Sequence, residues 1–219
     1  MAIHEIKTKA FLFDMDGTLV DSRPVVENVL RKFSEKHNLE LQKVIDYAHG
    51  RQSIDTATHF LGNNDFAMQE AKFLEREELL PQSLKLVKAM TGAKELLDLI
   101  DPNDWVLVTS ASREIALERM KAAQLPIPKI TVCAEDVTNG KPSPDGYLLA
   151  ATKIDIPIQQ CVVFEDAEAG IQAGINSGAQ VLAVNGFVNN VPNSVYQVNS
   201  LDKITITHEQ DFYRLSFTI

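Results

Sequence analysis

The stretch Lys9–Ser22, KAFLFDMDGTLVDS, is the most informative part of the sequence. An apolar run leads directly into two aspartates, Asp14 and Asp16, which are followed by Gly17 and Thr18. A solvated turn is one interpretation, because turns favour Asp and Gly. The alternative is a pair of carboxylates at the end of a buried strand, since the run lacks the alternation of a strand with one face in water.

The composition is that of a soluble globular protein, with either one large domain or a core domain that carries a smaller insert. The chain has 219 residues, of which 45% are hydrophobic and 23% charged. Its net charge of -9 disfavours nucleic acid and anionic membranes as partners, because both are polyanions. No signal peptide or membrane-spanning run is found, so we expect a cytoplasmic protein. Cys133 and Cys161 lie in apolar runs, which predicts buried, reduced thiols.

Short apolar runs alternate with amphipathic stretches, which is typical of a parallel sheet covered by helices on both faces. The runs predicted as strands are KAFLFD (9–14), WVLVTS (105–110), KITVCAE (129–135), CVVFED (161–166) and QVLAVN (180–185). Helices are predicted over 112–124, 143–153 and 166–178, with Ser112 as a possible N-cap and Gly178 as the final stop. The predicted fold class is therefore α/β, with a Rossmann-like core.

Residues 20–88 break this alternation. The spacing of their apolar residues is helical throughout, and no stretch reads as a strand. We therefore predict a core of residues 1–19 and 89–219 and an inserted, all-helical cap of residues 20–88. Inside the insert, the charged stretch EREELL (75–80) is expected to present a solvated face. The C-terminal segment 202–219 alternates in part, which predicts an edge hairpin around 208–211.

Polar side chains follow four of the predicted strands. They are Asp14 and Asp16, Thr109 and Ser110, Lys141, and Glu165 and Asp166. Ligands bind at the carboxyl ends of the strands in a parallel α/β sheet, so these groups should meet there. Carboxylates this close together need a cation, because like charges raise one another's pKa. An all-oxygen site suits Mg²⁺ together with substrate phosphate, which predicts a Mg²⁺ cofactor and a phosphate ester substrate.

The two aspartates of the first motif can have separate roles. Asp14 could attack phosphorus and form an aspartyl phosphate, which divides one hard displacement into two easier steps. Asp16 could protonate the leaving alkoxide and later deprotonate the hydrolytic water. Gly17 would allow the sharp turn that follows, and Thr18 could brace it. The Lys141 ammonium would neutralise the phosphate, whose oxygens the Ser110 hydroxyl and nearby backbone N–H groups would hold.

Four stretches resemble the ordered motifs of the haloacid dehalogenase (HAD) superfamily of phosphohydrolases. They are FDMDGTLVDS, VTSAS, GKPSPDGY and VVFEDAEAG, and they lie within residues 11–170. The insert after the first motif resembles the type-1 cap of that superfamily. The whole chain is most similar to the small sugar-phosphate phosphatases of its β-phosphoglucomutase-like branch. Because the hydrolytic dehalogenases lack the second aspartate, Asp16 favours phosphoryl chemistry.

The resemblance implies a role for each motif residue. Asp14 corresponds to the nucleophile and a Mg²⁺ ligand, and Asp16 to the general acid/base, whose backbone carbonyl also reaches the metal. Glu165 and Asp166 correspond to the acidic metal pair. Ser110, or Thr109 if the second motif is aligned one residue earlier, corresponds to the phosphate-binding hydroxyl, and Lys141 to the lysine of the third motif. The residues expected to bind substrate around these groups are Thr18, Thr109 and Ala111.

One loop of the insert could set specificity. In AHGRQSID (48–55), His49, Gly50, Arg51 and Gln52 place donors beside a flexible glycine. One interpretation is that this loop enters the closed site and contacts sugar hydroxyls or phosphate. The other is a turn between two helices whose polar residues face water. Both remain open from the sequence.

The expected function is hydrolysis of small sugar or sugar-alcohol phosphates by a monomer that binds neither nucleic acid nor membrane. A phosphosugar mutase is the first alternative. It is disfavoured because this chain has Val26 where mutases of the superfamily place a histidine, and because no cap lysine is recognisable. A regulator that binds phosphometabolites without catalysis is the second alternative. It is disfavoured because no nucleophile or metal ligand is missing.

Overall fold

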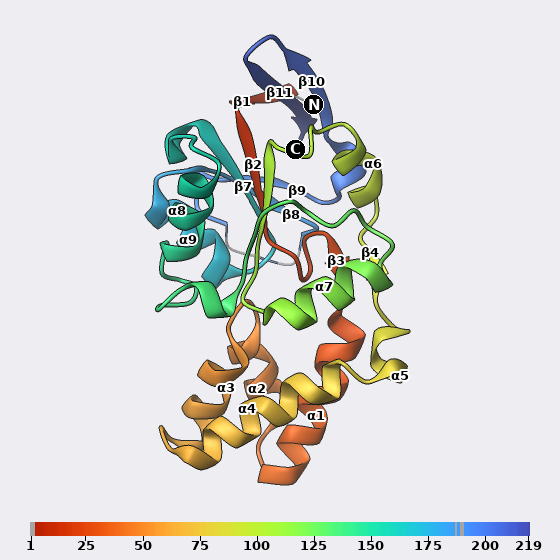
Figure 1. Ribbon diagram of the computed structural model, residues 1–219, viewed down its shortest axis with the longest axis vertical. Helices are drawn as coiled ribbons and strands as arrows, with labels where there is room; N and C mark the ends of the chain where they lie inside the picture. The colour runs from red at the N-terminus through yellow and green to blue at the C-terminus, as the bar shows by residue number, and fades with distance from the viewer. Residues whose placement is uncertain (1–2, 187, 189–190) are drawn as a thin grey trace.

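A six-stranded parallel sheet forms the core of the protein. The computed structural model describes residues 3–186, 188 and 191–219 (Figure 1). The strand order is β6-β5-β2-β7-β8-β9. The strands are β2 (Ala10–Phe13), β5 (Trp105–Val108), β6 (Thr131–Val132), β7 (Cys161–Glu165), β8 (Gln180–Val184) and β9 (Tyr196–Val198). Strand β2 is therefore central, and both of its neighbours pair with it in parallel.

Both faces of this sheet are buried. Phe11 and Phe13 of β2 enter one apolar cluster, whereas Ala10 and Leu12 enter the other. The helices α6 (Ala93–Asp98) and α7 (Arg113–Ala122) cover the first face, and α8 (Asp145–Lys153) and α9 (Glu168–Ser177) cover the second (Figure 1). Burial on both sides explains why the strands read as continuous apolar runs.

The predicted parallel sheet with helices on both faces is confirmed, as are its five strands and three helices. Gly178 ends α9 at φ +83°, as the sequence predicts. Ser112 occupies the N-cap position of α7, but its side chain makes no capping hydrogen bond. Cys133 and Cys161 are free and buried, and burial raises the pKa of each thiol to about 11.

Residues 23–84, here called the helical segment, form a separate group of helices at one end of the molecule (Figure 1). Its helices are α1 (Arg23–His37), α2 (Leu41–Ala48), α3 (Ser53–Leu61), α4 (Asp65–Glu78) and α5 (Pro81–Leu84). Two short strands that the sequence did not reveal, β3 (Val20–Asp21) and β4 (Lys88–Ala89), pair antiparallel where the segment leaves and rejoins the core. The segment thus begins and ends at one place.

The predicted C-terminal hairpin is present. Strands β10 (Thr205–Glu209) and β11 (Phe212–Thr218) pair antiparallel, and β11 also pairs with β1 (Ile3–Thr8) in a separate three-stranded sheet. Short 3₁₀ turns lie at Ala134–Asp136, Ile158–Gln160 and Leu201–Lys203. Within the described residues, none of the helices combines the length and the apolar character that crossing a bilayer requires.

Candidate active site

Three carboxylates meet at the carboxyl ends of the two central strands. Asp14 follows β2, Glu165 ends β7 and Asp166 comes next, and each offers an oxygen within 4.8 Å of the others. The parallel register of the two strands produces this meeting, because Phe13 is paired with Phe164. The Asp14 N–H donates to the Phe164 carbonyl at 3.0 Å, which carries the ladder one residue further.

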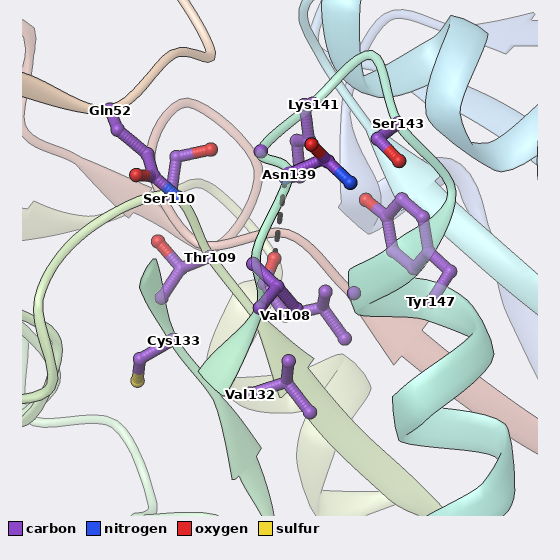
Figure 2. Close-up of a pocket in the computed structure, with 13 residues that line it drawn as sticks. Gln52, Val108, Thr109, Ser110, Val132, Cys133, Asn139, Lys141, Ser143 and Tyr147 are labelled. Carbon is purple, nitrogen blue, oxygen red and sulfur yellow. Dashed lines mark hydrogen bonds between the residues drawn. The ribbon is translucent and has the colours of Figure 1, made fainter. Parts of the chain in front are cut away.

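Lys141 places its ammonium group among these carboxylates. Its Nζ donates to Asp14 Oδ1 at 2.5 Å and lies 2.6 Å from Glu165 Oε1. It also donates to the Val108 carbonyl at 3.3 Å, the bond drawn in Figure 2. One ammonium group therefore contacts two of the three carboxylates, and Asp14, Lys141 and Glu165 are all buried.

The residues of this cluster fit a divalent cation. Burial, followed by the charge of Glu165, raises the pKa of Asp14 to about 8 despite the opposing charge of Lys141. Burial and then the charge of Asp14 also raise the pKa of Asp166 well above its usual value. Two carboxyl groups that resist ionisation need added positive charge to act as carboxylates. Their oxygen donors are those preferred by Mg²⁺.

Neighbouring groups fix the orientation of the acidic pair. The Tyr147 hydroxyl donates to Glu165 Oε1 at 2.6 Å, and the Asp166 N–H donates to Glu165 Oε2 at 3.2 Å. Two glycines leave the space that the carboxylates occupy. A Cβ atom at Gly170 would lie 1.8 Å from Glu165 Oε1, and one at Gly17 would lie 1.9 Å from Asp166 Oδ2. The carboxylates thus stand where only glycine leaves room.

Asp16 lies apart from the three-carboxylate cluster and has its own donors. Ser22 Oγ and Arg119 Nη1 each donate to Asp16 Oδ1 at 2.6 Å. The other terminal nitrogen of the same guanidinium, Nη2, lies 3.1 Å from Glu78 Oε2 at the end of α4. The predicted solvated face of EREELL is therefore wrong for Glu78, whose side chain is only 12% exposed and faces a buried cation.

A cavity of about 680 Å³ opens above the carboxylates, between the core and the helical segment. Asp14, Asp16, Asp166 and Arg119 line it from the core. From the helical segment come Val26, Glu27, Leu30, Asp46, His49, Gly50, Arg51, Leu74 and Glu78. The volume suits a small organic ligand.

The loop predicted to set specificity lies at the cavity wall. His49, Gly50 and Arg51 all line the cavity, and the Gly50 carbonyl accepts a hydrogen bond from Ser110 Oγ at 2.9 Å. The Arg51 guanidinium lies 4.7 Å from the centre of the Tyr47 ring, which favours a fixed position for this cation. A loop that touches the core in this way is not simply a turn in water.

Of the residues predicted to lie around the phosphate, some line the large cavity and one does not. Ser110 and Ala111 line the large cavity, as does Thr109, whose Oγ1 accepts a hydrogen bond from the Ala111 N–H at 3.1 Å. Thr109, Ser110 and Lys141 also line a second pocket of about 20 Å³, which Figure 2 shows with Gln52 of the helical segment on its wall. Thr18, in contrast, is fully buried and donates to Asp166 Oδ1 at 3.3 Å, so it braces a carboxylate and does not line the cavity.

Sequence reasoning missed four polar residues at this site. They are Ser22, Glu78, Arg119 and Tyr147. A signal existed for Arg119, because it shares the buried face of α7 with Ile115, Ala116 and Met120 at helical spacing. A cation on an apolar stripe is expected to have a specific partner.

A family comparison agrees with this geometry. The model of the haloacid dehalogenase-like hydrolases matches residues 8–178, which include all four motifs and the whole helical segment. The chain belongs to the haloacid dehalogenase-like hydrolase family. Hexitol phosphatase A of Escherichia coli strain K12 is 39% identical over 207 residues, which cover 94% of each chain. Glycerol-1-phosphate phosphohydrolase 2 of Saccharomyces cerevisiae is 30% identical and covers 82% of this chain and 75% of its own length.

The fold of this HAD-like hydrolase also agrees with solved structures. The crystal structure of β-phosphoglucomutase from Clostridium difficile superposes with a TM-score of 0.79 over 90% of this chain and 93% of that one, at 20% identity. At this identity the likeness concerns the fold alone. The family match and the phosphatase relatives confirm the prediction that the protein is a phosphoric monoester hydrolase.

Proposed function

We propose that this HAD-like hydrolase is a Mg²⁺-dependent phosphatase of sugar or sugar-alcohol phosphates that works through an aspartyl phosphate on Asp14. The observation that carries the proposal is the cluster of Asp14, Glu165 and Asp166 with Lys141 at the base of a cavity of about 680 Å³. The similarity to hexitol phosphatase A supports a polyol or sugar as the alcohol part of the ester.

The cation would be held by side-chain oxygens of Asp14 and Asp166, with Glu165 beside them and the Asp16 carbonyl as a further ligand. When bound, Mg²⁺ would supply positive charge to the phosphoryl oxygens and keep the acidic groups ionised. The raised pKa of Asp14 supports this assignment, because a nucleophilic carboxyl group must be deprotonated to attack. The Lys141 ammonium, 2.5 Å from Asp14 Oδ1, would share the phosphoryl charge.

The first step joins Asp14 to phosphorus. A carboxylate oxygen forms the new P–O bond while the bond from phosphorus to the substrate alcohol breaks, and Asp16 gives a proton to the departing alkoxide. In the second step Asp16, now ionised, takes a proton from water as the water oxygen attacks phosphorus. The bond to Asp14 breaks, and inorganic phosphate is released.

The helical segment is proposed to act as the cap that selects the alcohol. It supplies about half of the residues that line the cavity, including His49, Arg51 and Glu27, whereas the core supplies the phosphoryl chemistry. The Ser110–Gly50 hydrogen bond supports a closed arrangement that excludes bulk water. Val26 gives this wall an apolar side chain, which cannot exchange protons, and this favours hydrolysis over a mutase reaction.

The test is phosphate release from a panel of hexitol, hexose, pentose and glycerol phosphates, with Mg²⁺ and with EDTA. We expect release with Mg²⁺, none with EDTA, and the highest kcat/KM for a sugar or sugar-alcohol phosphate. The Asp14→Asn variant should fold and be inactive. β-Glucose 1-phosphate is also tested for isomerisation. Conversion to glucose 6-phosphate without release of phosphate would mean that the protein is a mutase and not a phosphatase.

A further inference from the structure

Arg119 lies between two carboxylates that come from different parts of the chain. It is in the middle of α7, is only 3% exposed, and donates from Nη1 to Asp16 Oδ1 at 2.6 Å. Its Nη2 lies 3.1 Å from Glu78 Oε2, at the C-terminal end of α4. Asp16 belongs to the core, whereas Glu78 belongs to the helical segment. A single guanidinium therefore connects the catalytic loop to the cap proposed above.

Two of the three nitrogens of the Arg119 guanidinium are buried. Nε and Nη2 are buried and have no hydrogen-bond partner among the described residues, so the 3.1 Å contact with Glu78 is an ion pair without hydrogen-bond geometry. Arg119 also lines the cavity, but its Nε and Nη2 are enclosed and its Nη1 donates to Asp16 Oδ1. Arg119 can therefore influence the reaction through Asp16, whose side chain is 29% exposed and lines the cavity.

The contacts of Asp16 define how its carboxylate is held. Ser22 Oγ and Arg119 Nη1 both donate to Oδ1. Two donors on one oxygen fix the plane of the carboxylate and leave Oδ2 for proton exchange with the substrate alcohol. Removal of the guanidinium would also leave Asp16 and Glu78 as two carboxylates that repel each other, because each lies against the same cation.

We propose that Arg119 is a positioning residue that holds Asp16 in its proton-transfer geometry, and that Glu78 seats Arg119 only when α4 is packed on the core. The inference rests on the proposed phosphatase function. Through Glu78 and Arg119, the helical segment would fix the orientation of the Asp16 carboxylate. The general acid would then be in place when the cavity is closed. The planar guanidinium of arginine can contact two carboxylates at once, whereas the ammonium of lysine is a single point charge.

The test uses two esters with different needs for a proton. Hexitol 6-phosphate releases an alkoxide, which must be protonated, whereas p-nitrophenyl phosphate releases a stable phenolate. General acid catalysis contributes on the order of 100- to 10,000-fold. We expect Arg119→Gln to lower kcat/KM for the hexitol ester by about 100-fold and that for the nitrophenyl ester by less than about 10-fold. Arg119→Lys should lie between wild type and Arg119→Gln.

Two further variants keep the test decisive if Arg119→Gln does not fold. Glu78→Gln removes the charge of the cap partner and keeps its shape, and we expect a loss of about 10-fold that is again confined to the hexitol ester. In the Asp16→Asn background the same substitution should have no further effect, because both act through one carboxylate. The control is Arg113→Gln on the same helix, whose guanidinium pairs with Asp136, and it should change neither ester.

The outcomes separate the two proposals. Wild type that releases phosphate from neither ester removes the proposed function, and the inference with it. Wild type that hydrolyses both, combined with folded Arg119 and Glu78 variants that lose activity equally on both esters, overturns the inference alone. A change in KM for the hexitol ester with an unchanged kcat would also overturn it, because that result would mean that Arg119 contacts the substrate.

Discussion

Replacement of Gly17 by alanine tests whether the carboxylate cluster depends on the space that glycine leaves. The added Cβ would lie 1.9 Å from Asp166 Oδ2, and real Cβ contacts are not found below 3.0 Å. The carboxylate of Asp166 must therefore move by about 1 Å, and a misplacement of that size costs about 100-fold in rate. Gly17 also has φ +81°, so any side chain there adds backbone strain of about 1–2 kcal/mol.

The chain offers a matched control for the backbone strain. Gly178, at the end of α9, has φ +83°, but the nearest atom to an added Cβ is Gln159 Nε2 at 3.8 Å. Gly178→Ala should thus lose about 1–2 kcal/mol of unfolding free energy and retain its activity. Gly17→Ala should lose at least as much stability, about 100-fold in kcat, and much of its response to Mg²⁺.

The assay combines urea unfolding with phosphate release at a series of Mg²⁺ concentrations. A Gly17→Ala variant with wild-type kcat and a wild-type Mg²⁺ requirement would refute the argument that Asp166 stands in a place only glycine permits. A loss of activity in Gly178→Ala would refute the separation of strain from steric displacement.

Other features of the site lead to three further predictions. Alanine is favoured over glycine inside helices by about 1 kcal/mol. Gly170→Ala should nevertheless lower both Tm and activity, because the added Cβ would lie 1.8 Å from Glu165 Oε1. A raised Tm with full activity would contradict this prediction. Burial raises the pKa of Glu78 from 4.5 to about 7, so the native state binds more protons than the unfolded state between these values and the unfolding free energy falls as pH rises through them. In urea titrations, the unfolding free energy of the wild type should fall between pH 5 and pH 8, and Glu78→Gln should remove up to about 3 kcal/mol of that fall. An identical pH dependence of wild type and variant would count against this prediction. Because protons compete with metal for Asp14, whose pKa is raised to about 8, saturating Mg²⁺ should raise Tm more at pH 8 than at pH 6, and an equal rise would show that these carboxyl groups do not bind the ion.

The residues that follow the strands could be predicted because the rule behind them is geometrical. Parallel strands end at one edge of a sheet, so Asp14 after β2 and Glu165 at the end of β7 must meet once both runs are recognised as strands. The large helices of the insert were equally readable from their periodicity. In contrast, β3, β4 and β9 have two or three residues each, which is too short for any periodic pattern.

The connection from Asp16 through Arg119 to Glu78 could not be predicted in the same way. It depends on which face of α4 meets α7, and a helix with many charged residues does not reveal this from its own sequence. Arg119 lies on the buried stripe of α7, so its burial was readable, but the identity of its partners was not. Contacts between elements far apart in sequence were thus the part that required the structure.

The short pairing of β3 with β4 has a consequence for how the chain folds. Strand β2 ends at Phe13, whereas its neighbour β5 begins only at Trp105, so their pairing must close a long loop at an entropic cost. Once Val20 and Ala89 are paired, the helical segment becomes a side loop of its own, and the path from β2 to β5 is much shorter. Because this ladder must itself close the loop around the helical segment, helix packing that brings Val20 and Ala89 together would lower the entropic cost of assembling the central sheet.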